Sequence, residues 1–209
     1  MNDLLAPIAS YYTDKLRQFG DEPRGVDWNG PEGQAHRFAQ LCQLLTPDSP
    51  FSIIDVGCGY GALLDFLEDR FKERMSACEY VGLDISDAML EAAARRHANR
   101  PYARFVHGTQ APTRADFVVA SGIFNVRLTS TDEAWRTYIR DTLATMDASS
   151  TKGFAFNCLT SYSDRDRMRP DLYYADPCEL FDFCKRTFSR NVALLHDYGL
   201  YEFTILVRK

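Results

Sequence analysis

The chain has 209 residues, a length that suits a single domain burying about 70% of the surface that its unfolded form exposes. Its net charge of −5 at pH 7 is spread along the sequence without long blocks of one sign, so we expect no nucleic-acid-binding surface. No apolar run is long enough for a membrane span, and the short apolar N-terminal run lacks the basic start of a signal peptide.

The first 50 residues predict a helical segment ahead of the main domain. Residues 31–45 begin with Pro31, which helices tolerate in their first turn, and Phe38, Leu41 and Leu45 repeat at helical spacing. The sequence TPDSP at 46–50 breaks this helix. We therefore expect an N-terminal helical lid or extension over 1–50 and the rest of a single domain over 51–209.

Strand and helix patterns alternate from residue 51 onwards. Strand-like runs cover 51–56, 80–84, 104–107, 116–121 and 153–158, with amphipathic helical patterns after four of them. Two capping boxes, Ser130 with Glu133 and Asp176 with Glu179, predict the starts of the last two helices. Repeated strand–helix units predict a doubly wound α/β fold, in which a mostly parallel sheet carries helices on both faces.

The end of the chain breaks this alternation. The strand-like runs 191–196 and 201–207 are joined by a connection too short for a crossover helix. We therefore expect them to pair as a C-terminal antiparallel β-hairpin that closes the sheet.

The sequence SIIDVGCGYGALLDFL at 52–67 places three glycines between a strand pattern and a helix pattern. Each glycine inside regular structure costs roughly 0.5–1 kcal/mol relative to alanine, so a tight turn alone explains one of them, not three. Close approach of the backbone to a nucleotide-like ligand at the carboxyl ends of the strands explains all three. Gly57, Gly59 and Ala62 also fit the dinucleotide pattern G-x-G-x-x-A, which leaves a nicotinamide cofactor open.

Three features together resemble the class I S-adenosylmethionine-dependent methyltransferases. They are Asp55 two residues before Gly57, the segment YVGLDIS that ends the second strand with Asp84, and the reversed C-terminal hairpin. The resemblance covers residues 51–209. It implies a seven-stranded sheet of order 3-2-1-4-5-7-6, S-adenosylmethionine as cofactor and S-adenosylhomocysteine as its product.

The resemblance also implies the residues of the cofactor site. Asp84 would bind both ribose hydroxyls, and Asp55 would organise the loop near the methionine amino group. Cys58 has no base partner in the sequence, so its backbone rather than its thiol explains its place in the loop. The implied cofactor-binding residues are Asp55, Gly57, Cys58, Gly59, Gly61, Asp84, Ile85, Thr109, Gln110, Ser121 and Gly122.

Two segments outside the glycine loop are candidates for binding the acceptor. The N-terminal segment carries aromatic residues that either cover the site or belong to the core, and the polar loop 159–177 carries arginines that either bind an anion or pair with neighbouring aspartates. The candidate substrate-binding residues are Tyr11, Tyr12, Trp28, Arg165, Arg167 and Arg169. The candidate catalytic residues are Tyr173, Tyr174, Asn157 and His196.

We therefore expect a methyltransferase that acts on oxygen or nitrogen of a small molecule. Strands four and five end in Ser121 and Asn157 rather than in carboxylates, so we expect no metal. The six cysteines include no CxxC pair and read as reduced core residues, which favours a cytoplasmic location. An S-adenosylmethionine enzyme without methyl transfer, a nicotinamide-dependent oxidoreductase and a catalytically silent binding module are alternatives. The acceptor and the oligomeric state stay open.

Overall fold

The computed structural model of the protein describes residues 2–45 and 49–209, so most of the expected break at 46–50 lies outside the described residues. Its helices are α1 (Asn2–Phe19), α2 (Pro31–Leu41), α3 (Ala62–Phe71), α4 (Asp87–Arg96), α5 (Asp132–Ser149) and α6 (Pro177–Thr187). Its strands are β1 (Ser52–Val56), β2 (Glu79–Asp84), β3 (Ala103–His107), β4 (Ala115–Ala120), β5 (Ser150–Leu159), β6 (Asn191–Leu195) and β7 (Glu202–Arg208).

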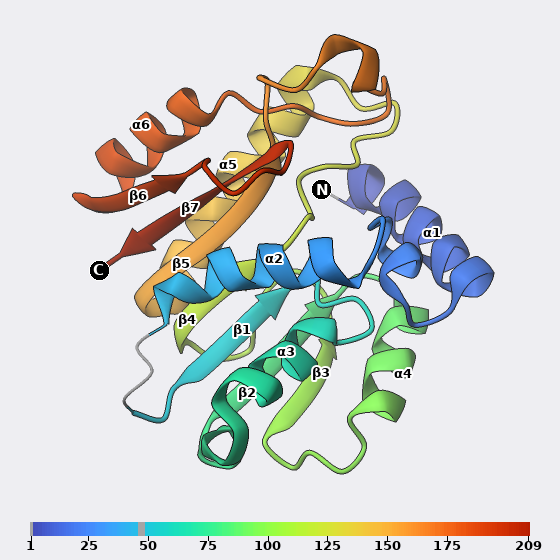
Figure 1. The fold of residues 1–209 in the computed structure, drawn as a ribbon, viewed down its shortest axis with the longest axis vertical. Helices are drawn as coiled ribbons and strands as arrows, with labels where there is room; N and C mark the ends of the chain where they lie inside the picture. The colour runs from blue at the N-terminus through green and yellow to red at the C-terminus, as the bar shows by residue number, and fades with distance from the viewer. Residues whose placement is uncertain (1, 46–48) are drawn as a thin grey trace.

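The strands form one sheet of order β3-β2-β1-β4-β5-β7-β6 (Figure 1). The pairs β3–β2, β2–β1, β1–β4 and β4–β5 are parallel, whereas β7 is antiparallel to both β5 and β6. The doubly wound fold class, the C-terminal hairpin and the strand order expected from the sequence are therefore confirmed.

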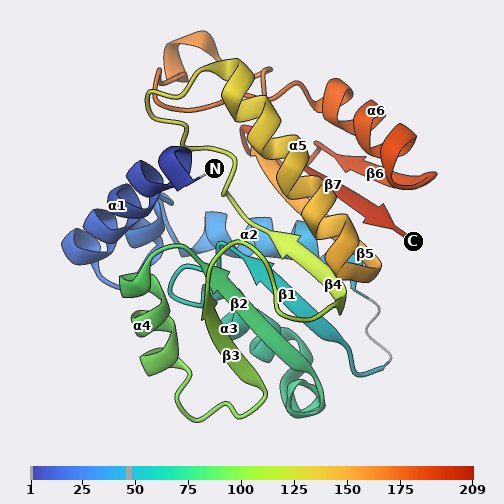
Figure 2. The ribbon, with the colours of Figure 1, turned by 180° about the vertical axis from the view of Figure 1, so that it is seen from behind.

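Helices cover both faces of the sheet and divide the core into two parts (Figures 1 and 2). Side chains of α5 and α6, such as Trp135 and Leu180, pack against alternate strand residues such as Ile54 and Val118. Side chains of α2 and α3 pack on the opposite face, against strand residues such as Ile53. This arrangement follows from the alternation of side chains across a strand, which sends neighbouring residues to opposite faces.

One of the two predicted helix caps differs from the expectation. The cap of α5 is Thr131, whose side chain accepts from the backbone N–H of Ala134, so the assignment of this role to Ser130 is wrong by one residue. The carbonyl of Ser130 instead accepts from Arg127. Asp176 does cap α6, with Oδ1 accepting from two backbone N–H groups of the first turn.

Residues 2–45 form two parts that lie in different places in the fold. Helix α1 lies beyond the carboxyl ends of β1 and β2, where a short 3-10 helix (Pro23–Val26) follows it (Figure 1). Helix α2 packs on the sheet and belongs to the layer that also holds α3. The proposed lid therefore comprises the segment before α2, while α2 itself is part of the core. Among the described residues, no helix is both long enough and apolar enough to cross a membrane.

Candidate functional site

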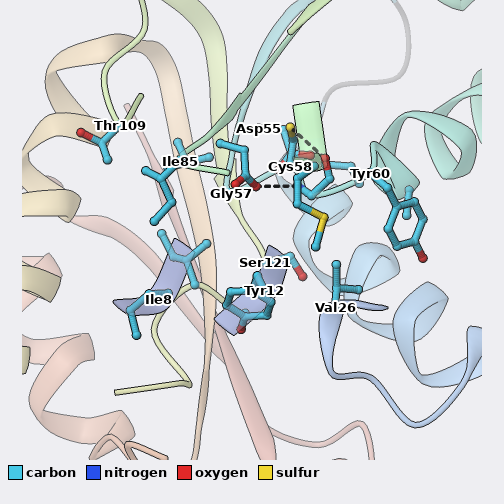
Figure 3. A pocket seen from close by; sticks show the side chains of 18 of the residues that line it. Ile8, Tyr12, Val26, Asp55, Gly57, Cys58, Tyr60, Ile85, Thr109 and Ser121 are labelled. Carbon is cyan, nitrogen blue, oxygen red and sulfur yellow. Dashed lines mark hydrogen bonds between the residues drawn. The ribbon is translucent and has the colours of Figure 1, made fainter. Parts of the chain in front are cut away.

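An inner cavity of about 100 Å³ lies at the carboxyl ends of β1, β2 and β4 (Figure 3). The glycine loop that follows β1 forms one wall, and the ends of β2 and β4 form two more. Helix α1 closes the cavity with Leu5, Ile8 and Tyr12, which are spaced by three and four residues and so share one face of the helix. This face of α1 therefore borders the cavity, and Ile8 also packs with the core of the sheet.

The conformation of the glycine loop explains why glycine is needed there. Gly57 has φ +73°, and a Cβ at this position would lie 2.2 Å from Cγ2 of Ile123, so both the backbone and the space exclude a side chain. The N–H groups of Gly57 and Cys58 both donate to the carbonyl of Leu83, at 2.7 and 2.9 Å. These bonds fix the loop against the end of β2.

Asp84 forms the wall of the inner cavity at the end of β2. Its Oδ2 accepts from the N–H of Gly59 at 2.9 Å, and its Oδ1 accepts from the N–H of Ser86 at 2.9 Å. Burial raises the pKa of the Asp84 carboxyl, and these backbone hydrogen bonds counteract that effect. Each carboxylate oxygen keeps a free lone pair, so both oxygens can still accept from hydroxyl groups of a ligand.

Asp55 lies beside Asp84 at the end of β1 and is also buried. Its Oδ2 accepts from the Tyr80 hydroxyl at 2.7 Å. Burial raises the pKa of Asp55 to about 7, with the hydrogen bond from Tyr80 opposing the rise. Neither Asp55 nor Asp84 forms an ion pair with a described residue, so the inner cavity offers two buried carboxylates to a cationic ligand.

Ser121, at the end of β4, supplies a further polar group without a protein partner. Its Oγ is buried and makes no hydrogen bond to any described residue, although Ser121 lines the inner cavity. A buried hydroxyl without a partner is uncommon, and a ligand in the cavity would satisfy it. The two carboxylates and this hydroxyl fit S-adenosylmethionine, which carries a sulfonium and an ammonium group together with ribose hydroxyls.

The structure brings most of the expected cofactor-binding residues together. Gly61 does not line the cavity, because it caps the N-terminus of α3 and packs against the ring of His97. Gln110 is exposed and also lies outside the lining. The remaining expected residues line the inner cavity: Asp55, Gly57, Cys58, Gly59, Asp84, Ile85, Thr109, Ser121 and Gly122. Burial raises the pKa of the Cys58 thiol, which keeps it protonated.

An outer cleft of about 660 Å³ adjoins the inner cavity. Tyr12, Val26, Trp28 and Gly122 line both spaces, so they form the junction between them. The loop before α2 forms one side of the cleft, and the loop after β5 forms the other. This volume lies within the range of about 300–1,000 Å³ that is usual for small-molecule sites.

A chain of polar contacts holds the junction in place. Asn157 Oδ1 accepts from the N–H of Gly122 at 2.7 Å, and its Nδ2 donates to Glu202 at 2.9 Å. Arg37 donates to both oxygens of Glu202, each at 2.8 Å. The Arg37 guanidinium stacks 3.9 Å from the centre of the Trp28 ring, and this ring occupies the space of a Cβ at Gly122. These contacts form a closed cycle from Gly122 through Asn157, Glu202, Arg37 and Trp28 back to Gly122.

Removing Arg37 is expected to destabilise the fold strongly. The side chain of Glu202 is 1% exposed, so Arg37→Ala leaves a buried carboxylate without its cation. We expect the free energy of unfolding to fall by about 3–5 kcal/mol, measured by urea denaturation. Arg186→Ala, which breaks an exposed ion pair with Asp182, is the control and should change it by less than about 1 kcal/mol. Equal effects of the two substitutions would contradict the assignment.

The structure places only some of the expected acceptor residues at the outer cleft. Tyr12, Trp28, Arg167, Arg169 and Tyr174 line the outer cleft, and Tyr12 and Trp28 reach the junction. Asn157 lies behind Gly122, where it holds the backbone rather than facing either space.

Four other expected residues lie outside both cavities. Tyr173 is buried in the core, where its hydroxyl accepts from Arg136, and His196 is exposed against Tyr162. Arg165 is exposed on the loop, and the Tyr11 hydroxyl donates to Asp27.

Arg169 connects the two sides of the outer cleft. Its guanidinium pairs with Asp171 at 2.5 Å on its own loop and lies 3.8 Å from Asp27 on the N-terminal segment. Asp27 also accepts from Lys15 at 2.7 Å and has a left-handed backbone with φ 63°. Arg169 therefore takes part in ion pairs, which agrees with the alternative that the loop arginines pair with neighbouring aspartates.

Several residues of the site carry no recognisable signal in the sequence. Arg37 and Glu202 are separated by 165 positions, and neither belongs to a motif. Asn125 follows β4 and lines the outer cleft, with Oδ1 accepting from the N–H of Leu159 at 3.1 Å. Val26 and Asp27 follow α1 in a segment without periodicity. Only the three-dimensional arrangement brings these residues to one place.

Asp65, Glu68 and His97 form a cluster with the spacing of metal ligands below the glycine loop. Both carboxylates already pair with arginines, Asp65 with Arg96 at 2.7 Å and Glu68 with Arg100. The ring nitrogen Nε2 of His97 lies 3.0 Å from the carbonyl oxygen of Gly61. These contacts account for the cluster as a support of the loop.

Comparison with known proteins identifies relatives over most of the chain. A model of the methyltransferase domain matches residues 54–146. The Mycobacterium tuberculosis (strain ATCC 25618 / H37Rv) protein "Putative methyltransferase Rv1506c" is 57% identical over 168 residues, covering 80% of this chain and 98% of that protein. The dTDP-4-amino-2,3,4,6-tetradeoxy-D-glucose N,N-dimethyltransferase of Saccharopolyspora spinosa is 34% identical over 99 residues, covering 46% of this chain and 36% of that protein.

A solved structure agrees with the fold over nearly the whole chain. The magnesium protoporphyrin IX methyltransferase of Synechocystis PCC 6803, crystallised with bound S-adenosylhomocysteine, superposes with a TM-score of 0.68 at 14% identity. The match covers 97% of this chain and 99% of that chain.

The chain belongs to the class I S-adenosylmethionine-dependent methyltransferases, and S-adenosylmethionine is its methyl donor. Membership of this family excludes the nicotinamide-dependent oxidoreductase, because that enzyme class uses a dinucleotide rather than S-adenosylmethionine.

Proposed function

We propose that the protein transfers a methyl group to oxygen or nitrogen of a small molecule bound in the outer cleft. The observation that carries this proposal is the junction of the two spaces at Tyr12, Val26, Trp28 and Gly122. A donor in the inner cavity and an acceptor in the outer cleft would meet there. The volume of the cleft and the methyltransferases that act on small molecules among the relatives support the same reading.

The chain's own part in the reaction is alignment. The sulfonium methyl group of S-adenosylmethionine is already activated, so the protein gains most by holding the acceptor in line with it. Trp28, held by Arg37, and the backbone of Gly122, held by Asn157, would fix the acceptor side of the junction. Alignment of this kind can lower a barrier by about 7–11 kcal/mol in favourable cases.

Tyr12 is the side chain best placed to contact the reacting groups. It lines both spaces, and its hydroxyl has no hydrogen-bond partner among the described residues. Burial raises the pKa of Tyr12, so at neutral pH it is a phenol that donates a hydrogen bond. We propose that this hydroxyl orients the acceptor.

Cofactor binding and turnover, measured together, test the proposed function. We expect micromolar binding of S-adenosylmethionine by calorimetry, and acceptor-dependent formation of S-adenosylhomocysteine by mass spectrometry. Tyr12→Phe should reduce kcat at least about tenfold while the affinity for the cofactor changes less than about threefold, because only the acceptor loses a hydrogen bond. Tight cofactor binding without transfer to any small molecule would instead favour the silent binding module or an enzyme that uses the cofactor otherwise.

A further inference from the structure

Among the described residues, none of the four junction residues (Tyr12, Val26, Trp28 and Gly122) carries an imidazole, an amine or a carboxylate that could remove a proton from the acceptor, and the acids Asp55 and Asp84 line only the inner cavity. The protein has four histidines, and in the described structure none of them lines either space. They lie on α2, below the glycine loop, at the end of β3 and after β6 (His36, His97, His107 and His196). No lysine lines either space among the described residues.

Two of the three carboxylates that line the outer cleft are occupied. Asp27 accepts from Lys15 and from Tyr11, each at 2.7 Å. Glu202 accepts from both Arg37 and Asn157 and is 1% exposed. Glu32 is the remaining acid in the lining; it is exposed in the first turn of α2 and does not line the inner cavity. A carboxylate that accepts several charged hydrogen bonds is a poor base.

The phenols near the junction are also unsuited to take up a proton. Burial raises the pKa of Tyr12, and it raises the pKa of Tyr138 to about 12. Both side chains therefore stay protonated at neutral pH and act as donors. An acceptor with a hydroxyl or a protonated amine would find no group at the junction to take its proton.

The same cleft offers hydrogen-bond donors. Arg37 has five N–H groups, of which two donate to Glu202 and one to the carbonyl of Gly33 at 2.8 Å, so two are left. Asn125 is 5% exposed, and its Nδ2 makes no hydrogen bond to a described residue.

Arg167 adds a third donor to the outer cleft, and its guanidinium has no ion pair within the described part of the chain. Guanidinium and amide N–H groups suit a planar carboxylate.

We propose that the acceptor presents a carboxylate to the junction and leaves as its methyl ester. This inference rests on the proposed function and specifies its acceptor. A carboxylate is ionised at neutral pH and needs no base, which agrees with the absence of one. Of the three guanidinium groups in the cleft, those of Arg37 and Arg169 are paired with carboxylates, whereas that of Arg167 has no ion pair among the described residues and can attract an anion.

The transfer balances without a proton. A lone pair of the carboxylate oxygen forms the new O–CH3 bond as the bond from the methyl carbon to sulfur breaks, and the electrons of that bond stay on sulfur. The products are a neutral methyl ester and S-adenosylhomocysteine. The protein contributes orientation through Arg37 and Asn125, and attraction of the anion through Arg167.

The test compares three acceptors that share one carbon skeleton. The protein is incubated with S-adenosylmethionine labelled in its methyl group and with a panel of monocarboxylates of increasing size, each alongside its primary amine and its primary alcohol. Mild alkali then releases labelled methanol from methyl esters, but not from ethers or N-methyl amines. We expect alkali-labile label from a carboxylate, at a rate at least about tenfold above its amine and alcohol partners.

Two substitutions on one loop provide a matched comparison. Arg167→Ala should raise KM for the carboxylate about tenfold with little change in kcat, because it removes an attractive charge at the edge of the site. Arg165→Ala is the control, since Arg165 is exposed on the same short 3-10 helix (Arg165–Arg167) but does not line the cleft. Both side chains are exposed, so neither substitution threatens the fold.

The outcomes separate this inference from the proposed function. Alkali-stable label in the amine or alcohol products alone would overturn the carboxylate and leave the methyltransferase with a small acceptor. Binding of S-adenosylmethionine without labelled product from any of the three classes would overturn both. Equal KM values for Arg167→Ala and Arg165→Ala would overturn the role of Arg167.

Discussion

An Asp84→Ala substitution is expected to weaken S-adenosylmethionine binding about 100-fold or more. The carboxylate is held by the N–H groups of Gly59 and Ser86, each at 2.9 Å, and each oxygen keeps a lone pair that can accept from a ligand. Hydrogen bonds to a charged group contribute about 1.5–3 kcal/mol each, and a tenfold change in affinity corresponds to 1.4 kcal/mol. Loss of two such bonds to the ribose accounts for the expected effect.

Calorimetric titration with S-adenosylmethionine and with S-adenosylhomocysteine measures this change. Asp87→Ala is the matched control, because Asp87 lies three residues further on with its side chain 85% exposed. We expect the control to bind both compounds normally. If a folded Asp84→Ala protein kept its affinity, the assignment of Asp84 to the ribose would be wrong.

Asp55→Asn is expected to stabilise the protein without cofactor, and to do so more at high pH. Burial raises the pKa of Asp55 from 3.8 to about 7, so between these values the folded protein holds a proton that the unfolded chain has released. Stability therefore falls as pH rises through this window, and the full cost of the buried carboxylate is present above pH 7. Asparagine avoids this cost, which is about 4 kcal/mol at most.

Urea denaturation at pH 5 and pH 8 distinguishes this effect from a general improvement in packing. We expect the gain from Asp55→Asn to be large at pH 8 and small at pH 5, while the Asn side chain still accepts the hydrogen bond from Tyr80. The same variant should bind S-adenosylmethionine more weakly, because a cation in the inner cavity loses its partner. A gain that is identical at both pH values would contradict the burial of a charged Asp55.

The glycine loop and the strands could be predicted because their signals are local. Asp55, Gly57 and Asp84 each follow a strand pattern by a fixed number of residues, and the carboxyl ends of parallel strands meet at one edge of a sheet. The local signal was less accurate at the start of α5, where Ser130 and Thr131 are adjacent and both suit a cap. Only the backbone geometry decides between two such neighbours.

The acceptor side could not be predicted to the same extent. Tyr173 and Tyr174 are adjacent in an extended segment, so they face opposite ways, and only Tyr174 lines the outer cleft. Which of the two points inward depends on how the loop bridges to Val126 through Leu172, and the sequence carries no sign of this pairing. Arg37 and Glu202 meet only because β7 inserts between β5 and β6 under α2.

The contact between Arg37 and Glu202 also bears on the order in which the site is completed during synthesis. The residues that line the inner cavity run from Leu5 to Tyr138, whereas the outer cleft needs Leu200, Tyr201 and Glu202 from the final strand and the turn before it. A ribosome makes the chain from its N-terminus, so every residue of the donor pocket is made before Glu202. The compartment for the acceptor is therefore the last part of the catalytic centre to exist in a newly made molecule.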